Sequence, residues 1–126
     1  MLTLIVLATL LLAPVVVYGK RVPPKPVKPV VANGVTYSAD GDGRAGYIIA
    51  TENATGKELW RTRVYSVHIK FWMEEDVQWV YITNLKIVGN SLLIRNETSR
   101  CYDLDLTKRK SKQISCPMDW QTADDK

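Results

Sequence analysis

Cys101 and Cys116 are the residues of this sequence whose chemistry is most readily predicted. An even number of cysteines in a small chain outside the cytoplasm typically forms disulfides. We therefore predict a Cys101–Cys116 bond, which would stabilise the fold by roughly 3 kcal/mol by restricting the unfolded chain. The alternative is two separate buried thiols, because neither cysteine belongs to a CxxC motif and a single histidine cannot complete a zinc site.

The remaining polar residues with catalytic or metal-binding potential do not form a recognisable set. His68 is the only histidine, and the sequence places no nucleophile or orienting acid beside it. Asp40 and Asp42 resemble the start of a calcium loop, but Arg44 occupies the third ligand position. We therefore expect a non-enzymatic protein with no catalytic residues, no cofactor and no metal site.

Residues 64–83 are rich in large aromatic side chains. Apolar and polar residues alternate over 64–72 and again over 77–83, with an acidic run between them. This period of two predicts a β-hairpin with an acidic tip.

The outer face of this hairpin is the candidate binding surface, since exposed aromatic side chains on strands suit partner docking. The alternative is that the domain's own sheets cover both faces, as is common for aromatic residues. The candidate residues are Trp72, Trp79, Glu74, Glu75 and Asp76.

Short strand signals bounded by Gly, Asn and Asp recur from residue 30 onward, and no window of useful length shows the helical period. The expected fold class is all-β. It is a small antiparallel meander or two-sheet sandwich of about seven to eight short strands, preceded by an N-terminal apolar segment and a Pro-rich spacer.

The chain divides into four predicted segments. Residues 1–19 are apolar and uncharged, which indicates a signal peptide or a membrane anchor. Residues 20–30 form a Pro/Lys-rich spacer with polyproline II character. Residues 31–118 form the β domain, and residues 119–126 a flexible C-terminal tail. The expected location is extracytoplasmic: periplasmic, secreted or membrane-anchored.

The net charge of +4 lies entirely outside residues 1–19. A mild positive charge suits contact with an anionic surface such as a membrane. Nucleic acid is not an expected partner, because the sequence has no basic helix and no array of arginine and aromatic residues.

Residues 33–61 read NGVTYSADGDGRAGYIIATENATGKELWR and contain a recognisable turn motif. They resemble one repeat of the pyrroloquinoline-quinone-type β-propeller, with Glu52 where that family has Asp. The resemblance implies a tight hairpin at Gly56 and a strand in which Trp60 is buried. The matching residues are Ala50, Thr55, Gly56, Lys57, Leu59 and Trp60.

A weaker copy of the repeat spans residues 89–112, where Asp105 aligns with Glu52 and the Gly and Trp are absent. Propellers need several blades to close, and this chain supplies two at most. The resemblance therefore implies local strand pairing and carries over no quinone site and no catalytic residue.

These observations together favour an exported, non-enzymatic binding or structural module of the cell envelope. The expected partner is an unidentified protein or a second copy of the chain, bound through a strand edge. The alternative function is a small extracytoplasmic enzyme of unrecognised type.

Overall fold

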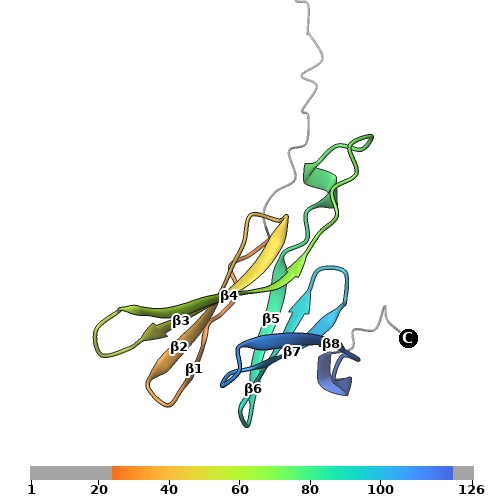
Figure 1. The fold of residues 1–126 in the computed structure, drawn as a ribbon. Helices are drawn as coiled ribbons and strands as arrows, with labels where there is room; N and C mark the ends of the chain where they lie inside the picture. Colours follow the sequence, from red (N-terminus) through yellow and green to blue (C-terminus); the bar gives the residue numbers. More distant parts are fainter. Residues whose placement is uncertain (1–23, 121–126) are drawn as a thin grey trace, which may run out of the picture.

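The computed structural model describes residues 24–120, which form two antiparallel sheets (Figure 1). The first sheet contains β1 (Val30–Ala32), β2 (Val35–Asp40), β3 (Ala45–Glu52) and β4 (Glu58–Ser66). The second contains β5 (Ile82–Val88), β6 (Ser91–Asn96), β7 (Cys101–Asp105) and β8 (Lys110–Ile114). Two short 3₁₀ turns complete the described elements, η1 (Asp76–Gln78) and η2 (Met118–Trp120).

Each sheet is a simple meander, because the strand orders are β1-β2-β3-β4 and β5-β6-β7-β8. Every neighbouring pair is antiparallel and joined by a short turn, as period-2 sequences separated by turn residues predict. The predicted all-β fold of short antiparallel strands is confirmed.

The core lies between the two sheets and follows the alternation of side chains along each strand. Inward positions of β3 and β6 are buried while their neighbours are only partly covered. Burying such aliphatic side chains contributes about 1.5–3 kcal/mol each. The buried apolar residues are Tyr37, Ile48, Ala50, Val64 and Tyr65 from the first sheet and Ile82, Leu92, Ile94, Cys101, Tyr102 and Leu104 from the second.

Side-chain contacts from β4 to β7 and β8 join the two sheets. The Ser111 hydroxyl donates to the Val64 carbonyl at 3.0 Å, and the rings of Tyr65 and Tyr102 stack with centroids 5.3 Å apart. At the other side β1 lies near β5. The edge strands of the first sheet therefore lie beside the edge strands of the second.

The predicted Cys101–Cys116 disulfide is confirmed, with the two Cα atoms 5.1 Å apart. It joins the start of β7 to the segment that follows β8, and Cys101 is fully buried. The bond thus closes the last hairpin of the second sheet.

The turns that end β3 and β7 have matching backbones, although only the first contains glycine. Gly56 donates its N–H to the Glu52 carbonyl at 2.8 Å, and Arg109 donates to the Asp105 carbonyl at 2.7 Å. Both Gly56 and Arg109 have positive φ, at 72° and 56°. Arginine therefore adopts at the second turn the conformation that glycine supplies at the first.

Trp60 is half-buried, whereas the repeat motif predicted a buried side chain. Its ring lies 5.9 Å from the ring of Tyr37, and the Arg109 guanidinium lies 5.5 Å from its centroid. The residue stands near the end of a sheet, so one face of the indole meets a cation at the surface rather than a second apolar layer.

The predicted hairpin over residues 64–83 is wrong except at its two ends, which lie in β4 and β5. β4 stops at Ser66, whose partner Ala45 is the first residue of β3, and β5 starts at Ile82, opposite the last residue of β6. Residues 67–81 therefore extend past the ends of both neighbouring strands. An isolated pair of strands is marginal in water, and this segment forms a loop with η1 instead.

The ends of the described chain lie against the domain. Val27 packs against the core, although it belongs to the predicted spacer, and Lys86 donates to the Asp119 carboxylate at 2.7 Å. The prediction for residues 1–19 lies outside the described residues, as does that for the tail 119–126 beyond its first two residues. Within residues 24–120, no helix has the length and apolar character needed to cross a membrane.

Candidate binding surface

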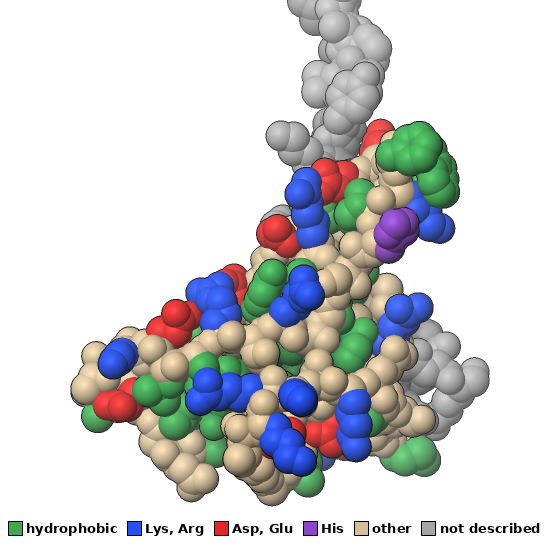
Figure 2. Space-filling model, viewed as in Figure 1, with side chains coloured by type: hydrophobic (Ala, Val, Ile, Leu, Met, Phe, Trp, Pro, Cys, Tyr) green, Lys and Arg blue, Asp and Glu red, His purple; other side chains and the backbone are tan. Residues whose placement is uncertain are grey.

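Residues 67–81, here called the projecting loop, extend beyond the two sheets at one end of the molecule (Figure 1). The tip of the loop is apolar and exposed: Phe71 is 93% and Trp72 67% accessible, and Met73 and Val77 are exposed as well. In the space-filling view, hydrophobic side chains gather at the end of the projecting loop (Figure 2). Such a grouping on a small domain is a candidate contact site.

The tip is ordered around its aromatic pair. The rings of Phe71 and Trp72 meet edge-on with centroids 5.1 Å apart, a preferred aromatic geometry. The Lys70 ammonium lies 5.9 Å from the centroid of the Trp72 ring. Phe71 and Trp72 therefore present one joint apolar surface with a cation at its border.

Gln78 holds the two sides of the loop together. Its carbonyl oxygen accepts from the Lys70 N–H at 2.6 Å, and its amide nitrogen donates to the Lys70 carbonyl at 2.9 Å. The same nitrogen lies 3.1 Å from the carbonyl oxygen of Glu74 and 3.3 Å from that of Met73. One side-chain amide thus satisfies backbone groups that a strand pairing would otherwise have satisfied.

The base of the loop is fixed to the turn between β2 and β3. The N–H of Val67 donates to the Arg44 carbonyl at 2.7 Å, and that of Val80 donates to the Gly43 carbonyl at 2.9 Å. Trp79 packs directly on Gly43, where an added Cβ would lie 2.4 Å from the Trp79 Cβ. The base of the loop is therefore held by close packing of Trp79 against the Gly43 backbone, which only glycine permits.

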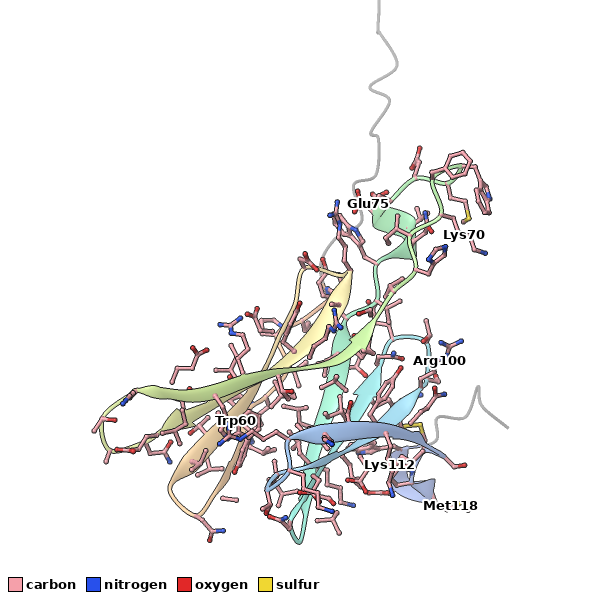
Figure 3. All side chains as sticks on the ribbon, in the orientation of Figure 1. Trp60, Lys70, Glu75, Arg100, Lys112 and Met118 are labelled. Atoms are coloured by element: carbon pink, nitrogen blue, oxygen red, sulfur yellow. A yellow bond between two sulfur atoms is a disulfide. The ribbon has the colours of Figure 1, made fainter. Side chains whose placement is uncertain are left out.

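An ion pair adds a second connection to the same turn. The Arg44 guanidinium donates to the Glu75 carboxylate, and this hydrogen bond lowers the pKa of Glu75 and raises that of Arg44. Both side chains are substantially exposed, so the pair orients the loop more than it stabilises the fold. Figure 3 shows Glu75 and Lys70 on opposite sides of the loop.

The structure separates the residues that the sequence grouped as one surface. Trp72 and Glu74 are exposed on the loop, whereas Trp79 is half-buried against Gly43 and Glu75 pairs with Arg44. Asp76 opens η1 and is half-buried.

Sequence reasoning missed Phe71, Met73 and Gln78. Phe71, Trp72 and Met73 are consecutive apolar residues between Lys70 and Glu74, and this run breaks the alternation that a strand requires. That break in the alternating pattern was the one feature of the sequence from which an exposed loop tip could have been predicted.

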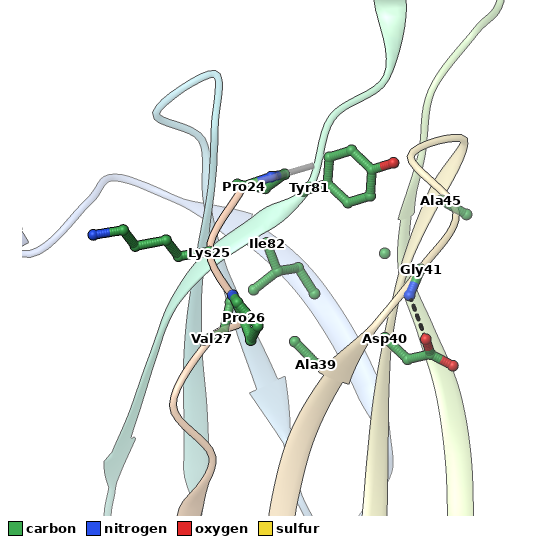
Figure 4. A pocket seen from close by; sticks show the side chains of 11 residues that line it. Pro24, Lys25, Pro26, Val27, Ala39, Asp40, Gly41, Ala45, Tyr81 and Ile82 are labelled. Carbon is green, nitrogen blue, oxygen red and sulfur yellow. Dashed lines mark hydrogen bonds between the residues drawn. The ribbon is translucent and has the colours of Figure 1, made fainter. Parts of the chain in front are cut away.

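The described residues also line small open cavities at the sheet ends. One of about 190 Å³ lies between the chain entering the domain and the ends of β2 and β3 (Figure 4). Lys25 extends away from it in this view, and Asp40 accepts hydrogen bonds from the Gly41 N–H and from Arg61. The lining is otherwise largely aliphatic, aromatic and backbone.

A second cavity of about 170 Å³ lies at the base of the loop, and its lining includes His68, Tyr65 and Arg100. Burial raises the pKa of Tyr65, and its hydroxyl donates to the Val80 carbonyl at 2.7 Å. Asn96 in the same lining accepts from the Arg100 N–H at 3.1 Å and from Thr98. These groups support the fold, and over residues 24–120 no three His, Cys, Asp or Glu side chains are grouped as metal ligands.

No protein-family model matches this chain, and no curated protein matches its sequence. The resemblance of residues 33–61 to a propeller repeat stays a prediction. The structural observation beside it is local: the turns after β3 and β7 share a backbone conformation at aligned positions.

Proposed function

We propose that this protein is an exported, non-enzymatic binding module of the cell envelope that contacts its partner through the tip of the projecting loop. The observation that carries the proposal is the exposure of Phe71 and Trp72 on a loop that is held in place by Gln78 and by the β2–β3 turn. Large aromatic side chains on a preorganised element lose little entropy on binding, which favours affinity.

Two features support an extracytoplasmic location. Residues 2–19 form an uncharged apolar run of the kind found in signal peptides and membrane anchors. The Cys101–Cys116 disulfide is consistent with an oxidising compartment.

The loop tip is a better candidate contact than a strand edge. The edge strands β1 and β4 of the first sheet lie beside β5 and β8 of the second. An edge that already faces another strand offers less room for a partner strand than a free edge does.

A binding role also accounts for the polar groups better than catalysis does. Tyr65, Asn96 and Asp40 are engaged in hydrogen bonds that hold the fold, and general acid–base catalysis needs such groups directed at a substrate.

Site-specific photo-crosslinking in intact cells tests the contact. A photoreactive amino acid replacing Phe71 should form adducts, whereas the same amino acid at the similarly exposed Met118 should not. Both sites are apolar and accessible, but Figure 3 places Met118 at the end of the molecule opposite Lys70. Equal adduct patterns at the two positions would contradict the proposal.

Export is tested separately by fusing residues 1–30 to a reporter that is active only outside the cytoplasm. We expect an active reporter, and a silent one with soluble cytosolic protein would contradict the proposed location.

A further inference from the structure

The described chain enters the domain at the base of the projecting loop. Pro24 lines the cavity shown in Figure 4 together with Gly41, Ala45 and Tyr81. The turn that contains Gly41 also carries the loop base, because Gly43 accepts a hydrogen bond from Val80. Whatever precedes Pro24 is therefore attached at the end of the molecule from which the loop projects.

The length of the connection restricts where the domain can sit if the apolar run is in a membrane. Four residues, 20–23, separate that run from Pro24. An extended chain covers at most about 3.3–3.6 Å per residue, so this connection reaches roughly 13–14 Å. Phe71 lies four residues beyond Val67, so the tip stands at most a similar distance above the base of the loop. A connection this short therefore allows the tip to reach the surface of that membrane.

The side chains at the tip suit the interface between lipid headgroups and acyl chains. Tryptophan is enriched at that depth because its indole is apolar with one polar N–H. Phe71 and Met73, which flank Trp72 in the sequence, supply further exposed apolar surface, and Lys70 beside the ring can extend its ammonium toward the headgroups.

The charges around the tip favour apolar insertion over electrostatic attachment. The loop carries Lys70 against Glu74, Glu75 and Asp76, and Arg44 pairs with Glu75. This balance gives no net attraction to anionic lipid, so binding through the tip must come from the aromatic and Met side chains.

From these observations we infer that the tip formed by Phe71, Trp72 and Met73 inserts into the lipid interface of the membrane that anchors residues 2–19, so that the domain stands with the projecting loop toward the bilayer. The inference rests on the proposed extracytoplasmic function and names a lipid bilayer as the partner of the loop.

Depth-dependent fluorescence quenching tests the inference with the full chain reconstituted in phosphatidylcholine vesicles. The lipids carry bromine near the headgroup end of the acyl chain. Wild-type protein should show quenching and a blue-shifted emission, and Trp72→Phe should lose most of both changes. The matched control is Trp72→Phe combined with Met118→Trp, which keeps the tryptophan count and moves the probe to the opposite end.

The outcomes separate this inference from the proposed function. Lipid quenching of Trp72 without quenching at position 118 supports insertion of the tip. A Trp72 that stays accessible to a soluble quencher while the protein is bound to vesicles overturns the inference and leaves a protein partner for the loop. Protection of Trp72 that depends on protein concentration and not on brominated lipid also overturns it, in favour of self-association.

Discussion

Replacing Gly43 with alanine tests whether the projecting loop is held on the β2–β3 turn by close packing. Gly43 has a φ of 89°, where residues with a Cβ are strained, and the new methyl carbon would lie 2.4 Å from the Trp79 Cβ and 2.5 Å from its Cγ. Neither atom is the end of a flexible chain, so the indole and the loop that carries it must shift.

The expected loss of stability has two parts. An unfavourable φ costs about 1–2 kcal/mol and forced overpacking about 1–3 kcal/mol. Alanine also lowers the conformational entropy of the unfolded chain, which offsets about 0.4–1 kcal/mol of this loss. We expect Gly43→Ala to lower the free energy of unfolding by about 1–5 kcal/mol.

Gly56→Ala is the matched control, because Gly56 also has a positive φ of 72° but an added Cβ there would meet no atom within 4 Å. This variant should lose only the conformational part, about 1 kcal/mol. Urea denaturation followed by far-ultraviolet circular dichroism measures both variants, and trypsin cleavage after Lys70 reports the order of the loop. Equal stability losses, with unchanged cleavage after Lys70 in Gly43→Ala, would refute the packing argument.

Three further predictions concern the disulfide, the half-buried indole and the ion pair. Cys101→Ala combined with Cys116→Ala should lower the free energy of unfolding by roughly 3 kcal/mol, and an unchanged urea midpoint would contradict this. Trp60→Ala should cost about 2 kcal/mol, less than the roughly 3–5 kcal/mol of a fully enclosed aromatic side chain, as measured by thermal unfolding. The pKa of Glu75 is lowered in the folded protein, so the ion pair with Arg44 is complete above the ordinary carboxyl value of 4.5 and is lost as the pH falls through the lowered value. The nuclear magnetic resonance signals of the tryptophan indole N–H groups should follow that change in the wild type. An identical pH dependence of these signals in Arg44→Gln would exclude the ion pair as its cause.

The sequence predicts best the features that depend on neighbouring residues. The strands around residues 46–50 and 92–94 follow from alternation bounded by turn residues, and both lie in the observed strands. The Cys101–Cys116 bond follows from the cysteine count. These predictions need no knowledge of what lies across the core.

Features that depend on distant parts of the chain were not predictable in the same way. The pattern of residues 64–72 fits a strand, but β3 begins at Ala45 and leaves nothing for that strand to pair with. Gln78 could not be recognised as the residue that holds the loop, since its partners are backbone groups of residues 70–74 whose positions follow from the fold. For the same reason Trp72 and Trp79 looked equivalent in sequence and have different surroundings in the structure.

The arrangement of each sheet as one continuous stretch of chain has a consequence for how the protein folds. Within residues 24–120, all strand pairs join neighbours along the sequence, so each sheet closes only short loops and can form without the other. Low contact order of this kind favours rapid formation of two separate units, followed by their docking along β4 and β8. The projecting loop connects the two units. Its length therefore affects the rate at which the units dock far more than the rate at which either sheet forms. The disulfide lies wholly within the second unit, so its oxidation does not have to wait for the first.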